Sequence, residues 1–231
     1  VVAEYSLASG NIFTVRYTLL EGGILSVESD FKGVKSSKPV DVPRIGFRMR
    51  LPASADSFTY LGRGPEENYA DRFGGTLIGE YSSSASKEYV RYVRPQECGH
   101  HIDCEYLSIG GLAIRSDRFE FNALRCAVED LDSEEVVQRD YQWENKGPLT
   151  ENDPAKAKNH LRRQTHINDY VERDFVEVCV DYAQSGVGGY DSWGSRPDGD
   201  RCLWSDRDYS FRFAIVPARA MGVRKSLGFD F

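Results

Sequence analysis

Short runs of alternating apolar and polar residues recur along most of this chain, and clusters of Gly, Pro, Asp and Ser separate them. Alternation with a period of two places successive side chains on opposite faces of a strand, so each run predicts a β-strand. The predicted strands are residues 1–7, 13–19, 24–31, 44–51, 89–94, 103–109, 112–116, 119–124, 175–182 and 209–216. Many short strands without long helices between them indicate one large all-β domain, a sandwich or a barrel.

Turn and helix signals occupy the segments between these strands. Glu21-Gly22-Gly23 predicts the turn of a hairpin, and residues 81–86 are interpreted as a polar loop. Two segments favour a helix: residues 133–139, with Ser133 as a possible N-cap, and residues 154–163, which begin at Pro154. Both are short, and neither suits a catalytic scaffold.

Size and charge narrow the class of protein. A chain of 231 residues, 40% hydrophobic and 12% aromatic, fits a single domain over residues 1–231 with a sizeable core. The formal net charge of −7 and the scattered 29 Lys and Arg argue against nucleic acid as a partner. No apolar run approaches the roughly 20 residues that span a bilayer, so we expect a soluble domain without membrane contact.

The first residues already predict a strand, with no signal for its start before Val1. We therefore expect this chain to be a fragment of a longer polypeptide. A fragment leaves the compartment of the parent open between cytoplasm and periplasm.

Five cysteines form an odd set, so at least one thiol stays free in any compartment. We expect reduced, partly buried thiols. Residues 98–104 contain four potential metal ligands, Cys98, His100, His101 and Cys104. Structural zinc sites use a C-x₂₋₄-C spacing with a second ligand pair elsewhere, so we expect no metal at this segment.

Carboxylates are plentiful, but nothing in the sequence pairs them for catalysis. A retaining glycosidase needs two carboxyl groups about 5 to 5.5 Å apart. Glu66-Glu67 and Glu134-Glu135 are adjacent residues, which on a strand would face opposite sides. The sequence also lacks the G-x-x-x-x-G-K-[ST] and G-x-S-x-G motifs of nucleotide hydrolysis and serine esterases. We expect no catalytic residue and no cofactor in this chain.

One loop looks built to bind a ligand. Residues 186–194 read GVGGYDSWG, in which glycines and an acidic residue present one large ring. The flat face of Trp193 suits the C–H face of a sugar, although a core ring at a sheet corner has the same pattern. Asp191 either contacts the sugar or fixes the loop through backbone N–H groups. The residues expected to shape the loop are Gly188, Gly189 and Ser192.

A second block, residues 60–72, reads YLGRGPEENYADR. Its glycines and proline predict a tight turn at the end of a strand. Glu66, Asn68, Asp71 and Arg72 are expected to satisfy the backbone of this turn and one another.

These two blocks, with RPQE at residues 94–97, resemble the C-terminal small-chain domain of the multidomain β-galactosidases of glycoside hydrolase family 2. The resemblance covers about residues 1–217 and is weakest over 132–159. It implies a galactose mutarotase-like supersandwich, a large two-layer antiparallel β-sandwich. The family has Asn where Cys98 stands, and some of its members have an acidic residue where Tyr190 stands.

The resemblance also implies a division of labour. In the family both catalytic glutamates, and the Mg and Na ions that it often uses, belong to a barrel on the same or a partner chain. The tryptophan matching Trp193 reaches from the small-chain domain into that barrel and stacks on the sugar. The expected partners are therefore a β-galactoside, the barrel and other domains, and further copies of the parent enzyme.

Two other functions stay open. Related free-standing mutarotases and epimerases use a His with a carboxylate, and His160 or His166 with Glu97 or Glu177 would supply that pair. An independent carbohydrate-binding module would use the same Trp193 loop without a catalytic partner.

Overall fold

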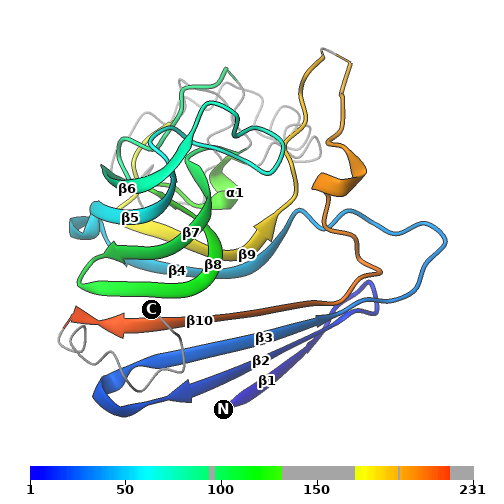
Figure 1. Ribbon diagram of the computed structural model, residues 1–231, viewed down its shortest axis with the longest axis horizontal. Coiled ribbons are helices and arrows are strands. Elements are labelled where there is room, and N and C mark those ends of the chain that lie inside the picture. The colour runs from blue at the N-terminus through cyan, green and yellow to red at the C-terminus, as the bar shows by residue number, and fades with distance from the viewer. Residues whose placement is uncertain (94–96, 132–169, 192, 219–231) are drawn as a thin grey trace, which may run out of the picture.

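The structure is a computed structural model that describes residues 1–93, 97–131, 170–191 and 193–218 (Figure 1). The predicted helices at 133–139 and 154–163 lie outside the described residues. So do His160, His166 and Ser192.

Ten antiparallel strands make up most of the described chain. They are β1 (Val2–Ser6), β2 (Ile12–Leu19), β3 (Leu25–Lys32), β4 (Arg44–Pro52), β5 (Ser57–Gly64), β6 (Leu77–Ser84), β7 (His100–Ile109), β8 (Leu112–Leu124), β9 (Phe175–Gln184) and β10 (Tyr209–Pro217). The described helical pieces are one turn each: η1 (Glu21–Gly23), η2 (Ala53–Ala55), α1 (Val128–Leu131) and η4 (Gly199–Arg201). The all-β prediction is confirmed.

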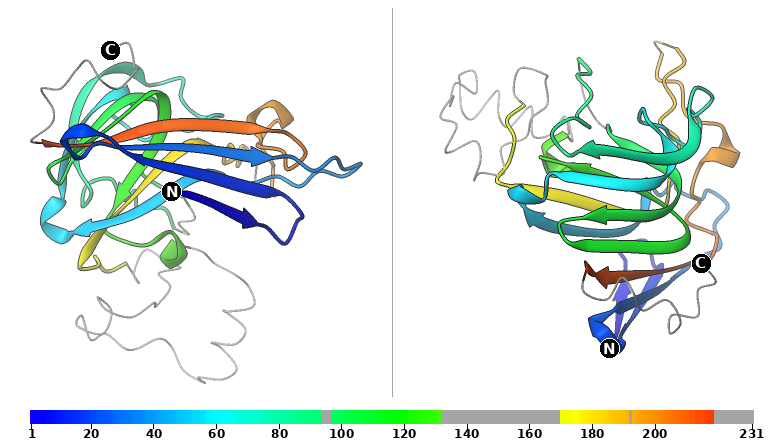
Figure 2. Two further views of the ribbon diagram at one scale, coloured as in Figure 1. Left: turned by 90° about the horizontal axis from the view of Figure 1, so that it is seen from below. Right: turned by 60° about the vertical axis from the view of Figure 1, so that its left-hand side comes forward.

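The strands form one sheet that folds over into two layers. Its order is β1-β2-β3-β10-β8-β7-β5-β6, and β9 joins β8 to β4. Residues 112–115 of β8 pair with β10, whereas residues 120–124 pair with β9. One layer therefore contains β1, β2, β3 and β10, and the other contains β4, β9, β8, β7, β5 and β6 (Figures 1 and 2).

Aromatic rings fill the space between the layers. Phe47 of β4 lies against Phe13 of β2 and Phe213 of β10, with ring centroids 5.9 Å and 5.2 Å apart. Phe58 and Phe121 meet edge to face at 5.7 Å. Such contacts between non-adjacent strands are what a sandwich core requires, and they explain why the alternating residues of both layers are buried.

Two local predictions were wrong. Residues 89–93 form no strand, and Tyr89, Val90 and Tyr92 are instead partly buried against a satellite cluster that contains Cys98 and Leu124. Residues 81–84, expected in a polar loop, end strand β6, which pairs along its length with β5. An edge strand exposes much of its surface, so its composition resembles that of a loop.

Other expectations hold. The Glu21-Gly22-Gly23 turn joins β2 to β3, with Gly22 at φ 77°. One expectation differs: the runs at 112–116 and 119–124, predicted as separate strands, are joined in the single strand β8. All five cysteines are free thiols, four of them buried. Within the described part of the chain, none of the helices has the length and apolar character needed to cross a membrane.

Candidate functional site

A tight turn at residues 69–72 forms one side of the candidate site. The backbone N–H groups of Tyr69 and Arg72 each donate to the other's carbonyl oxygen, at 3.0 and 2.9 Å. Fully buried Asn68 fixes this turn to the sheet. Its Nδ2 donates to the carbonyls of Arg63 and Glu66, at 2.9 Å each, and its Oδ1 accepts from the N–H of Ile102. The prediction that Asn68 satisfies the backbone of the Gly-Pro turn at the end of β5 is confirmed by its bonds to Arg63 and Glu66.

Asp71 lies at the tip of this turn and reaches the Trp193 loop. Its Oδ1 accepts the N–H of Val187 at 3.0 Å, and its Oδ2 accepts the N–H of Gly188 at 2.7 Å. The expectation that Asp71 pairs within residues 60–72 was wrong, because its carboxylate accepts from donors outside that block. The turn already pairs its backbone, so the carboxylate is free to bind backbone donors more than a hundred residues away.

The Trp193 loop, residues 186–195, leaves β9 and projects from the sandwich (Figure 1). Gly188 and Gly189 adopt φ of 63° and 86°, which residues with a side chain rarely adopt, and Gly189 donates to the carbonyl of Ser195 at 3.2 Å. The Oδ1 of Asp191 accepts from the N–H groups of Trp193 at 2.8 Å and Ser195 at 3.2 Å. Asp191 thus bonds to the backbone of its own loop, and its sugar contact stays a prediction.

The indole of Trp193 is 93% exposed. It is therefore not a core ring at a sheet corner. A large apolar ring held out in water on a hydrogen-bonded loop is typical of a binding face. The role of Trp193 in binding a sugar stays a prediction.

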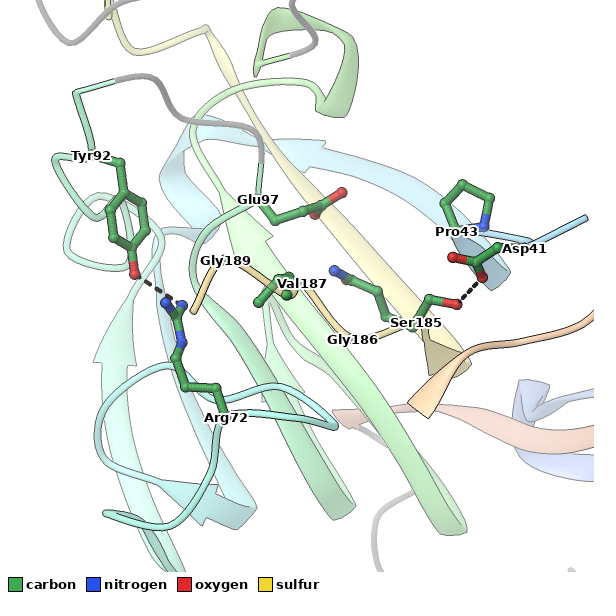
Figure 3. Close-up of a pocket in the computed structure, with 11 residues that line it drawn as sticks. Asp41, Pro43, Arg72, Tyr92, Glu97, Ser185, Gly186, Val187 and Gly189 are labelled. Atoms are coloured by element: carbon green, nitrogen blue, oxygen red, sulfur yellow. Dashed lines mark hydrogen bonds between the residues drawn. The ribbon is translucent and has the colours of Figure 1, made fainter. Parts of the chain in front are cut away.

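A polar pocket of about 410 Å³ lies between the turn and the loop (Figure 3). Its lining draws on all three segments that carry the family resemblance: Arg72 from residues 60–72, Glu97 from residues 94–97, and residues 186–189 from the Trp193 loop. Arg72 donates to the Tyr92 hydroxyl at 3.0 Å and to Glu67 at 2.8 Å. The other lining residues are Asp41, Pro43, Tyr92, Gln184 and Ser185.

A buried guanidinium lies beside the pocket. Nε of Arg44 is 3.1 Å from Asp181, and its Nη2 donates to Gln184 at 2.5 Å and lies 3.9 Å from Glu97. Burial raises the pKa of Glu97, and the nearby Arg44 partly opposes this shift. The pocket can therefore offer carboxylate, amide, phenol and guanidinium groups to hydroxyl groups of a ligand.

The side chains of His100 and His101, the two histidines of the candidate metal segment, point in different directions and contact different glutamates. His100 and His101 are neighbours on β7, so their rings face opposite sides of the strand. Nε2 of His100 lies 3.0 Å from Glu120, and Nε2 of His101 lies 2.9 Å from Glu88. Among the described residues no group of three or more His, Cys, Asp or Glu could hold a metal ion. The expectation that the segment binds no metal stays a prediction.

The two carboxylates considered for a mutarotase-like pair, Glu97 and Glu177, lie in different surroundings. Glu97 lines the pocket. Glu177 is buried on β9, where it accepts from Arg50 at 2.9 Å and from the N–H of Val128 at 2.9 Å. The histidines proposed to face them, His160 and His166, lie outside the described residues.

The site residue that sequence reasoning missed is Asp71. Its position beside Arg72 at the end of a tight turn suggested only local pairing. The available signal was the glycine-rich start of the loop, whose free N–H groups require an acceptor from elsewhere in the fold.

Comparison with known proteins identifies relatives of this chain. A protein called beta-galactosidase from Priestia megaterium is 29% identical over 226 residues, covering 94% of this chain and 19% of that protein. Beta-galactosidases from Actinobacillus pleuropneumoniae and Pseudoalteromonas haloplanktis are 26% and 30% identical, covering 93% and 87% of this chain. The chain spans less than a fifth of these relatives' lengths. The family described as beta galactosidase small chain matches residues 1–215, and this chain belongs to that family.

Proposed function

We propose that this chain is a domain of a β-galactosidase and supplies a sugar-stacking face to an active site whose catalytic carboxylates lie in another domain. The family membership and the small share of each relative that the chain covers support a larger parent enzyme. The observation that carries the proposal is the exposed indole of Trp193 on a hydrogen-bonded loop.

The proposed reaction is hydrolysis of terminal non-reducing β-D-galactose residues from β-galactosides. The chain contributes binding and orientation to this reaction, whereas bond cleavage belongs to the other domain, together with any Mg or Na that the parent uses. Stacking of an aromatic ring on a sugar contributes roughly 1 to 2 kcal/mol, which corresponds to about tenfold in affinity. The proposal therefore concerns substrate binding and leaves the chemical step to the partner domain.

The test uses the full-length β-galactosidase that contains this chain. Trp193→Ala should raise KM for a chromogenic β-galactoside and weaken galactose-type inhibitors by about tenfold, because a stacking face is lost. Trp193→Phe should recover part of the affinity. The unfolding temperature should change little, because a fully exposed ring leaves no cavity when it is truncated.

Leu19→Ala is the matched control, because Leu19 is also an exposed apolar side chain but lies on β2 in the other layer. It should leave KM and inhibitor affinity unchanged. A Trp193→Ala enzyme that is less stable but binds substrate and inhibitors as tightly as the wild type would refute the proposal.

A further inference from the structure

We infer that Asp71 is the positioning residue of the Trp193 loop: its carboxylate fixes the base of the loop and so sets where the indole lies. The expected effect of Asp71 on KM rests on the proposed function. The expected ordering of the loop by Asp71 does not depend on it.

Asp71 binds the loop through both of its carboxylate oxygens. Each oxygen accepts one backbone N–H, from Val187 at 3.0 Å and from Gly188 at 2.7 Å. Hydrogen bonds to an ionised acceptor are about twice as strong as neutral ones, and two in parallel also fix an orientation. Two successive peptide groups at the start of the loop are thus held by one side chain.

The residue before these donors is fitted to the same carboxylate. A Cβ built on Gly186 would lie 2.6 Å from Cγ of Asp71, closer than such atoms approach in proteins. Only glycine allows the backbone and the carboxylate to approach this closely. Residues 186–188 and Asp71 therefore form one complementary contact rather than a chance hydrogen bond.

Asp71 itself stands on a rigid base. The turn at 69–72 closes with two backbone hydrogen bonds, and the buried ring of Tyr69 stacks on His100 with centroids 5.5 Å apart. The neighbouring Arg72 is directed to Glu67 and Tyr92. A side chain presented from such a turn has few ways to move, so it can hold the start of the loop in place.

Among the described residues, hydrogen bonds hold the tip of the loop, including one from the Tyr190 hydroxyl to the carbonyl of Arg196 at 2.7 Å. Because Trp193 is 93% exposed, packing cannot set the direction of its ring, and the backbone hydrogen bonds of the loop must do so. Asp71 accepts the N–H groups of Val187 and Gly188 at the start of the loop. Further along, Gly189 donates to the carbonyl of Ser195, and Asp191 accepts the N–H of Trp193. Removing the first contact should loosen the rest.

Hydrogen exchange on the full-length enzyme measures this ordering without reference to activity. In Asp71→Ala, peptides covering residues 186–191 should exchange faster than in the wild type, since Val187 and Gly188 lose their acceptor. Asp71→Asn keeps one acceptor oxygen but turns an NH₂ group toward the second donor, so its exchange should be intermediate. This milder variant also serves if Asp71→Ala fails to fold.

Asp56→Ala is the matched control. Asp56 is likewise a carboxylate that accepts from a loop backbone, the N–H of Ser86 at 3.0 Å, as well as from the Ser86 hydroxyl at 2.8 Å. Its removal should speed exchange around Ser86 and leave residues 186–191 as in the wild type. Unchanged exchange over 186–191 in both Asp71 variants would overturn the inference.

A double-mutant cycle then tests whether Asp71 acts through Trp193. Asp71→Ala should raise KM by up to the factor seen for Trp193→Ala, and the double variant should be no worse than Trp193→Ala alone. Factors that multiply would overturn the inference. Faster exchange in Asp71→Ala together with a normal KM in Trp193→Ala would uphold the positioning role and refute the proposed function, so the two failures are distinguishable.

Discussion

The Oε2 atom of Glu120 lies 3.0 Å from Nε2 of His100, and both side chains are buried in the layer that supports the pocket. The same oxygen accepts the N–H of Gln184, a pocket residue, at 2.8 Å. Burial lowers the pKa of His100 well below its usual value, and burial raises the pKa of Glu120 to about 7. The His100 imidazole is therefore neutral near pH 7, whereas the Glu120 carboxyl group titrates near that pH.

This titration predicts that stability falls as the pH rises. Glu120 binds its proton more tightly in the folded chain than in the unfolded one, so its contribution is fully present below about pH 4 and is lost as the pH passes about 7. The change from the ordinary value of 4.5 to about 7 corresponds to at most about 3 kcal/mol. The charged groups that also act on Glu120 are Arg118, Asp103, Arg44 and Asp181, whose own pKa burial raises to about 7.

Urea unfolding of the wild type and of Glu120→Gln, across about pH 5 to 8, measures this contribution. The amide keeps an acceptor for Gln184 but cannot ionise. The stability of the variant relative to the wild type should therefore improve as the pH rises. Parallel pH profiles for the two proteins would show that Glu120 does not carry the effect.

Gly186→Ala should disturb the site without adding or removing charge. The new Cβ would meet the Asp71 carboxylate at 2.6 Å, so the carboxylate must move away from the N–H groups of Val187 and Gly188. We expect KM of the full-length enzyme to rise severalfold, in the direction of Trp193→Ala, and exchange of residues 186–191 to quicken.

Gly74→Ala is the control for that substitution, because a Cβ there would meet nothing within 4 Å. It should leave KM and exchange as in the wild type. Equal effects of the two alanines would mean that chain stiffness matters, rather than the contact with Asp71.

The isolated chain should not hydrolyse a chromogenic β-galactoside. We expect both catalytic carboxylates to lie in another domain, and a binding face alone does not break the glycosidic bond. The measurement is turnover by the purified chain at high protein concentration. Activity that disappears when a carboxylate of this chain is replaced would contradict the expectation.

The strands that could be predicted from sequence are those whose alternation reflects burial against the opposite layer. Val176, Val178 and Val180 alternate along β9 and all three lie in the core, so the pattern located that strand. The apolar residues of segment 89–93 are buried for another reason, since Tyr89, Val90 and Tyr92 cover a satellite cluster without strand pairing. Periodicity reports which side chains are buried and does not report which backbone groups are paired.

The candidate site could be predicted only in part for a related reason. The Trp193 loop can be recognised from nine consecutive residues, because its glycines and its tryptophan lie within residues 186–194. The contact between Asp71 and Gly188 joins residues 117 positions apart, and it depends on how β5 and β9 are arranged in the sheet. No local pattern encodes such a distance, so the acceptor of the loop became evident only in the fold.

The Trp193 loop also connects the two layers, because it leaves β9 in one layer and the chain re-enters the other layer as β10 (Figure 2). Strand β8 is the seam between them, pairing with β10 at residues 112–115 and with β9 at residues 120–124. A small rotation of one layer relative to the other about β8 is expected to change the position of the Trp193 indole. Under the proposed function, substitutions at this seam, remote from any sugar, are expected to change substrate binding by moving the Trp193 loop.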